Sequence, residues 1–360
     1  MCGATKNVVK TALGHNCGDD GICTRCGAFV GVQPEGDGST DKPYQIANYL
    51  NLVWFQQFVD SGNYSANAVL TADITANKNL LNENGELSGT PEYIWTPIRQ
   101  RSSNSLAAYS GVFDGQGHTI SGLYAPKSSK CALFGTANGT IKNTFITDSY
   151  FGGSYCYFAA SFVGFGFSEC VIENCGSDAV VEGYYYCGGI AGETSGTIKN
   201  CYFAGKISAD TTYSSAIASD DYGNGTLTNC YYLDTCGLAS TRATAKTTEE
   251  FASGEVCYKL NSGVTDGKQA WYQTLAEDTL PKLNGKTVYY DESVDPQYYN
   301  KDVIGDVSCD GTTDKADAAL VLRYISGIGT LSDYQLTVAD ANSDGKVDML
   351  DVVEILGLVG

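Results

Sequence analysis

Gly139-Thr-Ile-Lys-Asn143 returns unchanged as Gly196-Thr-Ile-Lys-Asn200, and this five-residue phrase decides the fold. Three looser copies keep an aliphatic residue at the third position and Asn or Gly at the fifth. They are His118-Thr-Ile-Ser-Gly122, Cys170-Val-Ile-Glu-Asn174 and Gly225-Thr-Leu-Thr-Asn229. Recurrence of this kind indicates a chain built from stacked structural repeats.

A short apolar segment that ends in a small residue precedes each of the last four copies. These segments recur at intervals of 29, 28 and 27 residues, and they are Leu133-Phe-Gly135, Phe162-Val-Gly164, Ile190-Ala-Gly192 and Ile217-Ala-Ser219. A period of about 28 residues, with two or three strands per repeat and Gly/Asn turns, predicts a parallel β-helix, which we expect to be right-handed. We therefore expect a mainly β solenoid over residues 43–290.

Equivalent positions of the copies should form columns, because neighbouring coils stack at about 4.8 Å. The third position predicts an inward aliphatic ladder of Ile120, Ile141, Ile172, Ile198 and Leu227. The fifth falls at a corner where Asn and Gly tolerate a left-handed backbone, and it reads Gly122, Asn143, Asn174, Asn200 and Asn229. The next position reads Leu123, Thr144, Cys175, Cys201 and Cys230. We expect its three cysteines to form a buried thiol stack, with one disulfide as the alternative.

The run Gly188-Gly-Ile-Ala-Gly192-Glu-Thr-Ser-Gly196-Thr-Ile-Lys-Asn200-Cys201-Tyr202 resembles the GLUG motif. Proteins with this motif are β-helical segments of bacterial surface proteins, including regions beside immunoglobulin-A-cleaving metalloproteases. Trp95-Thr-Pro-Ile98 and the stretch 109–123 look like the first coils of the same family. The resemblance implies an adhesin-like solenoid and supplies no catalytic residues.

Both ends of a β-helix expose unpaired edges and an apolar bore, so they need caps. Residues 48–59 have helical apolar spacing after a strand at Tyr44–Ile46, and we expect them to cap the N-terminal end. We expect the segments 247–252, 256–260 and 271–274 to close the other end. Residues 291–302 are predicted to be a linker.

The last sixty residues contain two copies of a loop with oxygen-bearing side chains at positions 1, 3, 5, 9 and 12 and glycine at position 6. Calcium needs six to eight oxygens at about 2.3–2.6 Å, and position 7 supplies a backbone carbonyl. Loop 1 (306–317) predicts a calcium site made by Asp306, Ser308, Asp310, Thr312, Asp314 and Asp317. Loop 2 (340–351) predicts a second site made by Asp340, Asn342, Asp344, Lys346, Asp348 and Asp351.

Both loops end in Asp, each feeds an apolar helix, and no helix precedes Asp306. Residues 303–360 therefore resemble the type I dockerin of cellulosomal proteins, a small all-α module. The resemblance implies calcium-coupled folding, docking to a cohesin module of a scaffoldin, and an extracellular location. The positions that cohesin reads would be Lys315, Ala316, Leu320, Arg323 and Tyr324, with Met349 and Leu350 of the second copy as the other choice.

The first 42 residues form a cysteine-rich segment with a Cys23-Thr-Arg-Cys26 knuckle. Such spacing is typical of a tetrahedral zinc site. The candidate ligands are His15, Cys23 and Cys26, with Cys2 or Cys17 as the fourth. Two disulfides among the same four cysteines are the alternative that an extracellular location permits. In either case we expect a structural staple.

The composition restricts the partners. A net charge of −19 over 360 residues argues against nucleic acid and against anionic membrane surfaces. The sequence contains no run of eighteen apolar residues, so we expect no membrane insertion. Met1-Cys-Gly-Ala lacks the charged start and apolar run of a signal peptide, so we expect a mature or truncated secreted chain.

Tyrosines recur through the coils, and Tyr155, Tyr157, Tyr184, Tyr186 and Tyr213 are the candidate glycan-binding residues. Outward tyrosines offer flat faces and hydroxyls to sugars. We predict no catalytic residues, and a solenoid that serves adhesion or carbohydrate binding. A polysaccharide lyase or glycoside hydrolase, using an acid and a base from Asp114, Asp148, Glu173 and Glu193, is the first alternative. A structural spacer in a surface assembly is the second.

Overall fold

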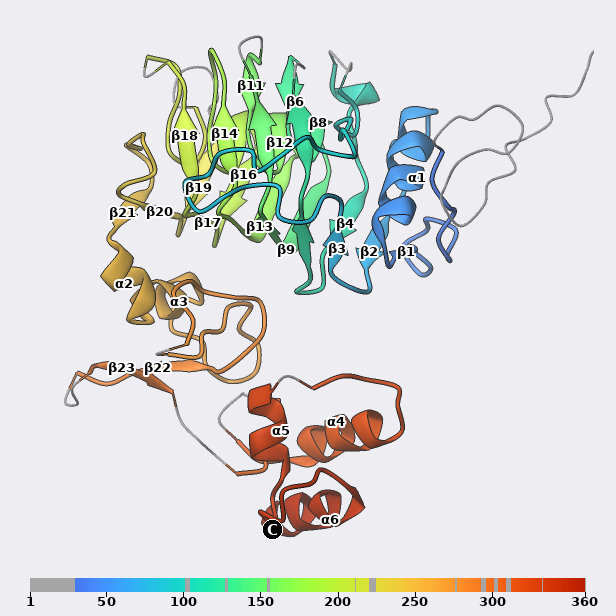
Figure 1. Cartoon of the computed structure of the whole chain (residues 1–360), viewed down its shortest axis with the longest axis vertical. Helices are drawn as coiled ribbons and strands as arrows, with labels where there is room; N and C mark the ends of the chain where they lie inside the picture. The colour runs from blue at the N-terminus through green and yellow to red at the C-terminus, as the bar shows by residue number, and fades with distance from the viewer. Residues whose placement is uncertain are drawn as a thin grey trace, which may run out of the picture.

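The computed structural model describes residues 30–100, 104–126, 129–153, 156–210, 212–219, 225–275, 277–292, 296–300, 304–308, 312–331 and 333–359. Figure 1 shows a parallel β-solenoid followed by a helical C-terminal module. Cys2, His15, Cys17, Cys23 and Cys26 lie outside the described residues, so the choice between zinc and disulfides stays a prediction.

Residues 44–232 form a solenoid of about six turns. The largest sheet stacks β1 (Tyr44–Ile46), β2 (Ala68–Leu70), β4 (Val112–Asp114), β9 (Thr140–Thr147), β13 (Val171–Ser177), β17 (Tyr202–Phe203), β20 (Tyr231–Leu233) and β21 (Thr244–Lys246). The same sheet also contains β3 (Ile74–Thr75), β5 (Thr119–Ser121), β16 (Thr197–Lys199) and β19 (Thr226–Thr228).

The remaining faces of the solenoid are smaller sheets of parallel strands. The second sheet contains β6 (Tyr124–Pro126), β10 (Tyr150–Gly152), β14 (Val180–Glu182) and β18 (Lys206–Ser208). The third contains β8 (Phe134–Ala137), β12 (Val163–Gly166) and β15 (Ala191–Thr194), and β7 (Lys130–Cys131) pairs with β11 (Phe158–Ala159). A short 3₁₀ helix covers Ser105–Ala107. The repeat-based prediction of a mainly β parallel solenoid is confirmed.

The inward aliphatic ladder differs from the prediction at its first rung. Phe113 of β4 pairs with Ile141, and the ladder continues through Ile172 and Ile198 to Leu227. Ile120 instead pairs with Ile146 in the second half of β9. The reason is that β9 spans eight residues and turns at Asn143, so two earlier strands pair with its two halves.

The asparagine ladder forms one corner of the solenoid. Asn143, Asn174, Asn200 and Asn229 all have φ between 51° and 54°. Each side-chain amide donates to the side chain one coil earlier, Asn174 to Asn143 at 3.0 Å and Asn200 to Asn174 at 3.3 Å. The ladder starts at Asp114, which accepts from Asn143 at 3.0 Å. Gly122 is not in this column, because it lies beside Asn77 at another corner.

The cysteine column is a stack of free thiols headed by Thr144. The backbone N–H of Cys175 donates to Cys201 Sγ at 3.4 Å, and Cys230 follows in the next coil. All nine cysteines among the described residues are free and buried. Burial raises the pKa of Cys201 well above its usual value, so these thiols behave as small apolar groups. Leu123, predicted for this column, is buried elsewhere.

The predicted N-terminal cap is helix α1 (Tyr49–Asp60). Asn48 caps it by accepting the N–H of Asn51 at 3.0 Å. Phe55 is fully buried, with its ring 6.1 Å from that of Tyr109 and 6.2 Å from that of Phe113. The helix therefore closes the bore of the first coil with aromatic side chains.

The other end is not closed as predicted. Helices α2 (Thr248–Ala252) and α3 (Glu255–Leu260) belong to a C-terminal lobe (247–300) that packs against the outer side of the largest sheet. Trp271 Nε1 donates to the carbonyl of Asn200 at 3.0 Å. The lobe also includes the antiparallel hairpin of β22 (Val288–Tyr290) and β23 (Tyr298–Asn300), the latter inside the predicted linker.

Residues 233–246 cover the C-terminal end of the solenoid. Cys236, Leu238 and Ala243 pack onto the last coil. The guanidinium of Arg242 donates to the carbonyl of Ser219 at 2.7 Å and to that of Gly225 at 3.0 Å. These contacts satisfy carbonyls at an edge that would otherwise be left unpaired.

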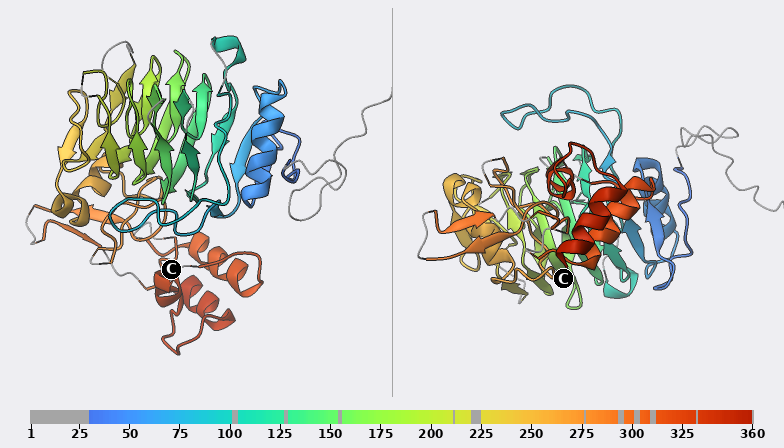
Figure 2. Two further views of the ribbon diagram at one scale, coloured as in Figure 1. Left: turned by 45° about the horizontal axis from the view of Figure 1, so that its top comes forward. Right: turned by 90° about the horizontal axis from the view of Figure 1, so that it is seen from below.

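The C-terminal module has its own core, and its described residues include helices α4 (Lys315–Ile325), α5 (Asp333–Ala339) and α6 (Met349–Leu358). The buried apolar side chains of this core are Val307, Ala318, Val321, Val338, Ala339, Val352 and Ile355. Figure 2 shows these helices gathered in one body next to the solenoid.

Candidate functional site

In loop 2 of the C-terminal module, backbone N–H groups of the loop donate hydrogen bonds to carboxylates of the same loop. Asp340 accepts the backbone N–H groups of Asp344 at 2.9 Å and of Gly345 at 2.8 Å. Gly345 has φ of 83°, which makes glycine the favoured residue at the sixth position. Asp351 is fully buried and accepts from Asn342 N at 3.3 Å and from Asp348 N at 2.8 Å.

Loop 1 repeats this arrangement where it is described. Asp317 is fully buried and accepts from Ser308 N and from Asp314 N, each at 2.7 Å. Asp306 is almost completely buried, and Ser308 Oγ donates a hydrogen bond to its carboxylate at 3.4 Å. Asp310 lies outside the described residues. The last carboxylate of each loop also completes a capping box with the residue that caps the following helix.

The oxygen donors of both loops fit a hard cation in type and order. The carboxylate at position 12 is buried in each copy, and the carboxylate at position 1 is buried in loop 1 (Asp306) and half-buried in loop 2 (Asp340). Oxygen donors on one backbone loop are what calcium coordination requires. Within the described part of the chain, no three acidic, histidine or cysteine side chains lie close enough together to hold a metal as they stand.

The two helix faces predicted to meet cohesin differ in polarity. On α4, Lys315, Ala316 and Arg323 are exposed and Leu320 and Tyr324 are half-buried. On α6 the exposed fractions are 54% for Met349, 61% for Leu350, 61% for Val353 and 46% for Leu356. Sequence reasoning missed Val353 and Leu356, whose spacing from Met349 by four and seven residues places them on one helix face.

Aromatic side chains from consecutive coils meet at one corner of the solenoid, in the segments that follow β10, β14 and β18. We call this the aromatic corner, and its members are Tyr157, Phe158, Tyr184, Tyr185, Tyr186 and Tyr213. Tyr157 and Tyr184 are about half exposed, and their rings meet edge to face at 6.2 Å. Tyr155 lies outside the described residues.

The inner part of the aromatic corner is held by ring contacts. Phe158 and Tyr186 stack at 5.2 Å, and Tyr185 meets Tyr213 at 5.3 Å. A hydrogen bond with Tyr184 raises the pKa of Tyr185 to about 12.

The carboxylates considered for an acid–base pair have structural partners. Asp114 pairs with Lys142 at 3.2 Å, and Glu173 pairs with Lys199 at 2.8 Å, each between adjacent coils. Asp148 accepts the backbone N–H groups of two residues of the long loop discussed next. Glu193 is buried in β15. Asp114 and Glu173 lie in one column of the largest sheet, where they flank Lys142. Asp148 follows β9 and Glu193 lies in β15, on another sheet.

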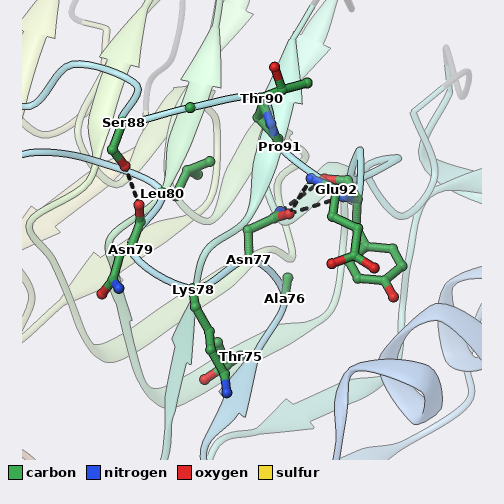
Figure 3. A pocket seen from close by; sticks show the side chains of 12 residues that line it. Thr75, Ala76, Asn77, Lys78, Asn79, Leu80, Ser88, Thr90, Pro91 and Glu92 are labelled. Atoms are coloured by element: carbon green, nitrogen blue, oxygen red, sulfur yellow. Dashed lines mark hydrogen bonds between the residues drawn. The ribbon is translucent and has the colours of Figure 1, made fainter.

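A long loop leaves the solenoid after β3 and encloses a cavity of about 620 Å³ (Figure 3). Residues 75–80 and 88–93 line it. The side chain of Asn77 closes the neck of the loop by donating to Tyr93 O at 2.9 Å and accepting from Tyr93 N at 3.0 Å.

Farther along the same loop, Asp148 accepts the N–H of Leu80 at 2.9 Å and of Leu81 at 2.8 Å. Asn77 and Asp148 are thus used to hold the loop against the solenoid. We interpret this cavity as space left by the path of the loop and not as a ligand-binding site.

Comparison with known proteins identifies the C-terminal module. Residues 304–356 match the dockerin type I domain family. Type I dockerins bind calcium. The presence of this domain implies docking to a cohesin in an extracellular, cellulosome-type assembly. The predicted dockerin is therefore confirmed.

Two further proteins are similar to parts of the chain. The chain is 25% identical over 225 residues to halomucin from Haloquadratum walsbyi (strain DSM 16790 / HBSQ001). This match covers 51% of the present chain and only 2% of the length of halomucin. It is 17% identical to a candidate immunoglobulin A1 protease from Bacteroides ovatus, with a TM-score of 0.45 over 69% of this chain and 94% of that one. In the described part of the chain, no helix is long and apolar enough to span a membrane.

Proposed function

We propose that this protein is a secreted component that docks through calcium-loaded dockerin loops to a cohesin of a scaffoldin, and that its solenoid binds carbohydrate without cleaving it. The match of residues 304–356 to the dockerin type I domain carries the docking half of the proposal. The aromatic corner supports the carbohydrate half, because it presents half-exposed tyrosine rings with hydroxyl groups.

Two calcium ions complete the dockerin. In the second site, Asp340, Asn342, Asp344, Asp348 and Asp351 supply side-chain oxygens and Lys346 supplies its carbonyl. In the first site, Asp306, Ser308, Asp310, Asp314 and Asp317 do the same with the carbonyl of Thr312. Clustered carboxylates repel one another, so the cation contributes directly to the folding of the module.

We assign the docking surface to the exposed face of α6, with cohesin as its occupant. Met349, Leu350, Val353 and Leu356 form an apolar surface of large side chains. The exposed face of α4 instead includes the charged Lys315 and Arg323 beside Leu322. Large apolar side chains exposed together on a small module mark an interaction surface. The α4 face is the alternative.

Two matched double variants separate the faces. Leu350→Asp with Val353→Asp should weaken binding of the full chain to a purified type I cohesin by at least about tenfold, because two apolar anchors are lost at the centre of the interface. Lys315→Glu with Arg323→Glu should change it much less. Isothermal titration in calcium measures both, and circular dichroism checks that each variant keeps its helices. The opposite ranking would place the docking surface on α4.

Titration with plant and mucin polysaccharides tests the carbohydrate half. The wild-type chain should bind at least one polymer saturably and release no new reducing or unsaturated ends. Tyr157→Ala with Tyr184→Ala should weaken that binding about thirtyfold, since each ring face contributes roughly a kcal/mol. New chain ends would show an enzyme instead, and absence of binding across the panel would favour a spacer.

A further inference from the structure

Two phenylalanines extend the aromatic corner along one coil of the solenoid. Phe165 lies in β12, and Phe167 follows directly after that strand. The ring of Phe165 meets that of Phe158 at 5.8 Å and that of Phe167 at 5.0 Å. Phe158 in turn stacks on Tyr186, so the ring contacts are continuous. We call the aromatic corner together with Phe165 and Phe167 the aromatic track.

Every residue of the aromatic track has accessible surface. Tyr157 and Tyr184 are exposed, and the other members are half-buried. Among the described residues, no member of the track belongs to a buried hydrophobic core or to the partly buried side chains packed against one. The rings of Phe158, Phe165 and Phe167 contact one another and a tyrosine instead. The track is therefore a surface feature that a ligand can reach.

The two ends of the aromatic track differ in chemistry. One end carries tyrosines, with ring centroids 4.2 Å apart for Tyr184 and Tyr185 and 5.3 Å apart for Tyr185 and Tyr213. Their hydroxyl groups can donate and accept hydrogen bonds. The other end, formed by Phe165 and Phe167, offers only aromatic rings. A ligand that contacts both ends needs hydroxyl groups as well as apolar faces, which pyranose rings combine.

The number of rings favours a ligand of several sugar units. One ring contact is too weak to offset the translational and rotational freedom lost on association, so several contacts must act together. Neighbouring ring centroids along the track are 4.2 to 6.2 Å apart, and its members come from three consecutive coils. Because the rings are held by contacts with one another, ordering them on binding costs little.

The charges around the aromatic track favour a neutral ligand. Asp210 is exposed and lies near Tyr185. The pKa of Tyr185 is raised mainly by the hydrogen bond with Tyr184, and the charge of Asp210 adds to this effect. The whole chain carries a net charge of −19. Polysaccharides with carboxylate or sulfate groups would meet a negative potential here.

We infer that the aromatic track binds an extended segment of a neutral polysaccharide, several sugar units long, an assignment that rests on the carbohydrate binding proposed above and specifies its ligand. Sugar hydroxyl groups meet the tyrosine end, and apolar sugar faces meet Phe165 and Phe167. The chain of sugars lies across three coils, from Tyr213 to Phe167.

Isothermal titration of the full, calcium-loaded chain tests this inference with cello-, manno- and xylo-oligosaccharides from the disaccharide to the hexasaccharide. In the series that binds, the hexasaccharide should bind at least about tenfold more tightly than the disaccharide, because it reaches more rings. Phe165→Ala with Phe167→Ala should weaken hexasaccharide binding about thirtyfold, the loss expected for two ring contacts. Disaccharide binding should change much less, because a short ligand can occupy the tyrosine end alone.

Tyr290→Ala removes an exposed ring of β22 outside the track and is the matched control, which should change nothing. Thermal melts show whether each variant is folded. If the double phenylalanine variant does not fold, Phe167→Ala alone should weaken hexasaccharide binding about fivefold.

The possible outcomes separate the ligand assignment from the proposed function. Absence of binding by every oligosaccharide and polysaccharide would overturn both. Binding that is weakened by Tyr157→Ala with Tyr184→Ala but unchanged by chain length and by the phenylalanine variants would overturn only the assignment. Tighter binding of a hexagalacturonide than of any neutral hexasaccharide would also overturn it. Self-association of the chain that the phenylalanine variants abolish would show that the track is an interface between copies instead.

Discussion

Single residues at the coil corner decide how the solenoid turns. Asn174 has φ of 51°, donates to Asn143 at 3.0 Å and accepts from Asn200 at 3.3 Å. The residue type thus serves twice, because asparagine tolerates the left-handed backbone and its amide continues the ladder. The sequence predicted this column correctly from Asn143 onward. It could not show that Asp114 heads it, because an aspartate does not match the Asn or Gly of the repeat.

Replacement of Asn174 by Ala should lower the free energy of unfolding of the solenoid by about 2–4 kcal/mol, since two hydrogen bonds are lost and alanine is strained at positive φ. Asn174→Gly is the matched control, because it keeps the backbone conformation and loses only the hydrogen bonds. Denaturant unfolding measures both. Equal stability of the alanine variant and wild type would contradict the proposed role of the ladder.

Asp178 should make stability depend on pH. Burial raises its folded-state pKa above the ordinary value of 3.8, so the charged form is disfavoured in the native state. Its contribution is therefore most favourable below pH about 4 and is lost as pH rises through the folded-state pKa. Asp178→Asn removes this penalty and should raise the melting temperature at pH 7.

The gain from Asp178→Asn should shrink as the pH falls toward 3.8 and vanish below it, where the wild-type carboxyl becomes protonated in the unfolded state as well as in the folded one. Thermal melts of both proteins between pH 4 and 8 measure the difference, with Asp234→Asn as the exposed control. A gain that grows toward acid pH would show that the native state favours the charged form.

At the scale of elements, the sequence located α1 and the repeated strands but misplaced the C-terminal closure. Phe145 faces outward between two inward residues, and Tyr202 is also covered by the lobe. The alternation along a strand therefore predicts an outward aromatic ring. It does not show which segment covers that ring, because the partner lies more than a hundred residues away and shares no repeat with it.

Helix α1 should be required for the stability of the first coils. Phe55→Ala should cost about 3–5 kcal/mol, the range for removing a fully buried aromatic ring. Phe58→Ala, on the same helix but only partly buried, should cost distinctly less. Chemical denaturation of both variants tests the cap, and equal losses would show that Phe55 does not seal the bore.

At the scale of the whole molecule, the dockerin and the solenoid have separate hydrophobic cores. Calcium removal should therefore unfold the module of α4, α5 and α6 and leave the solenoid folded. Amide hydrogen exchange with and without a chelator would show this directly. Loss of protection throughout β9 and β13 on chelation would instead mean that the two parts fold as one unit.

The measurement that tests the account most directly is titration of the full chain with a purified type I cohesin in calcium and in chelator. The account predicts saturable, one-to-one binding in calcium, loss of binding in chelator, and recovery when calcium is restored. Binding that persists unchanged in chelator, or no binding to type I cohesins in calcium, would contradict it.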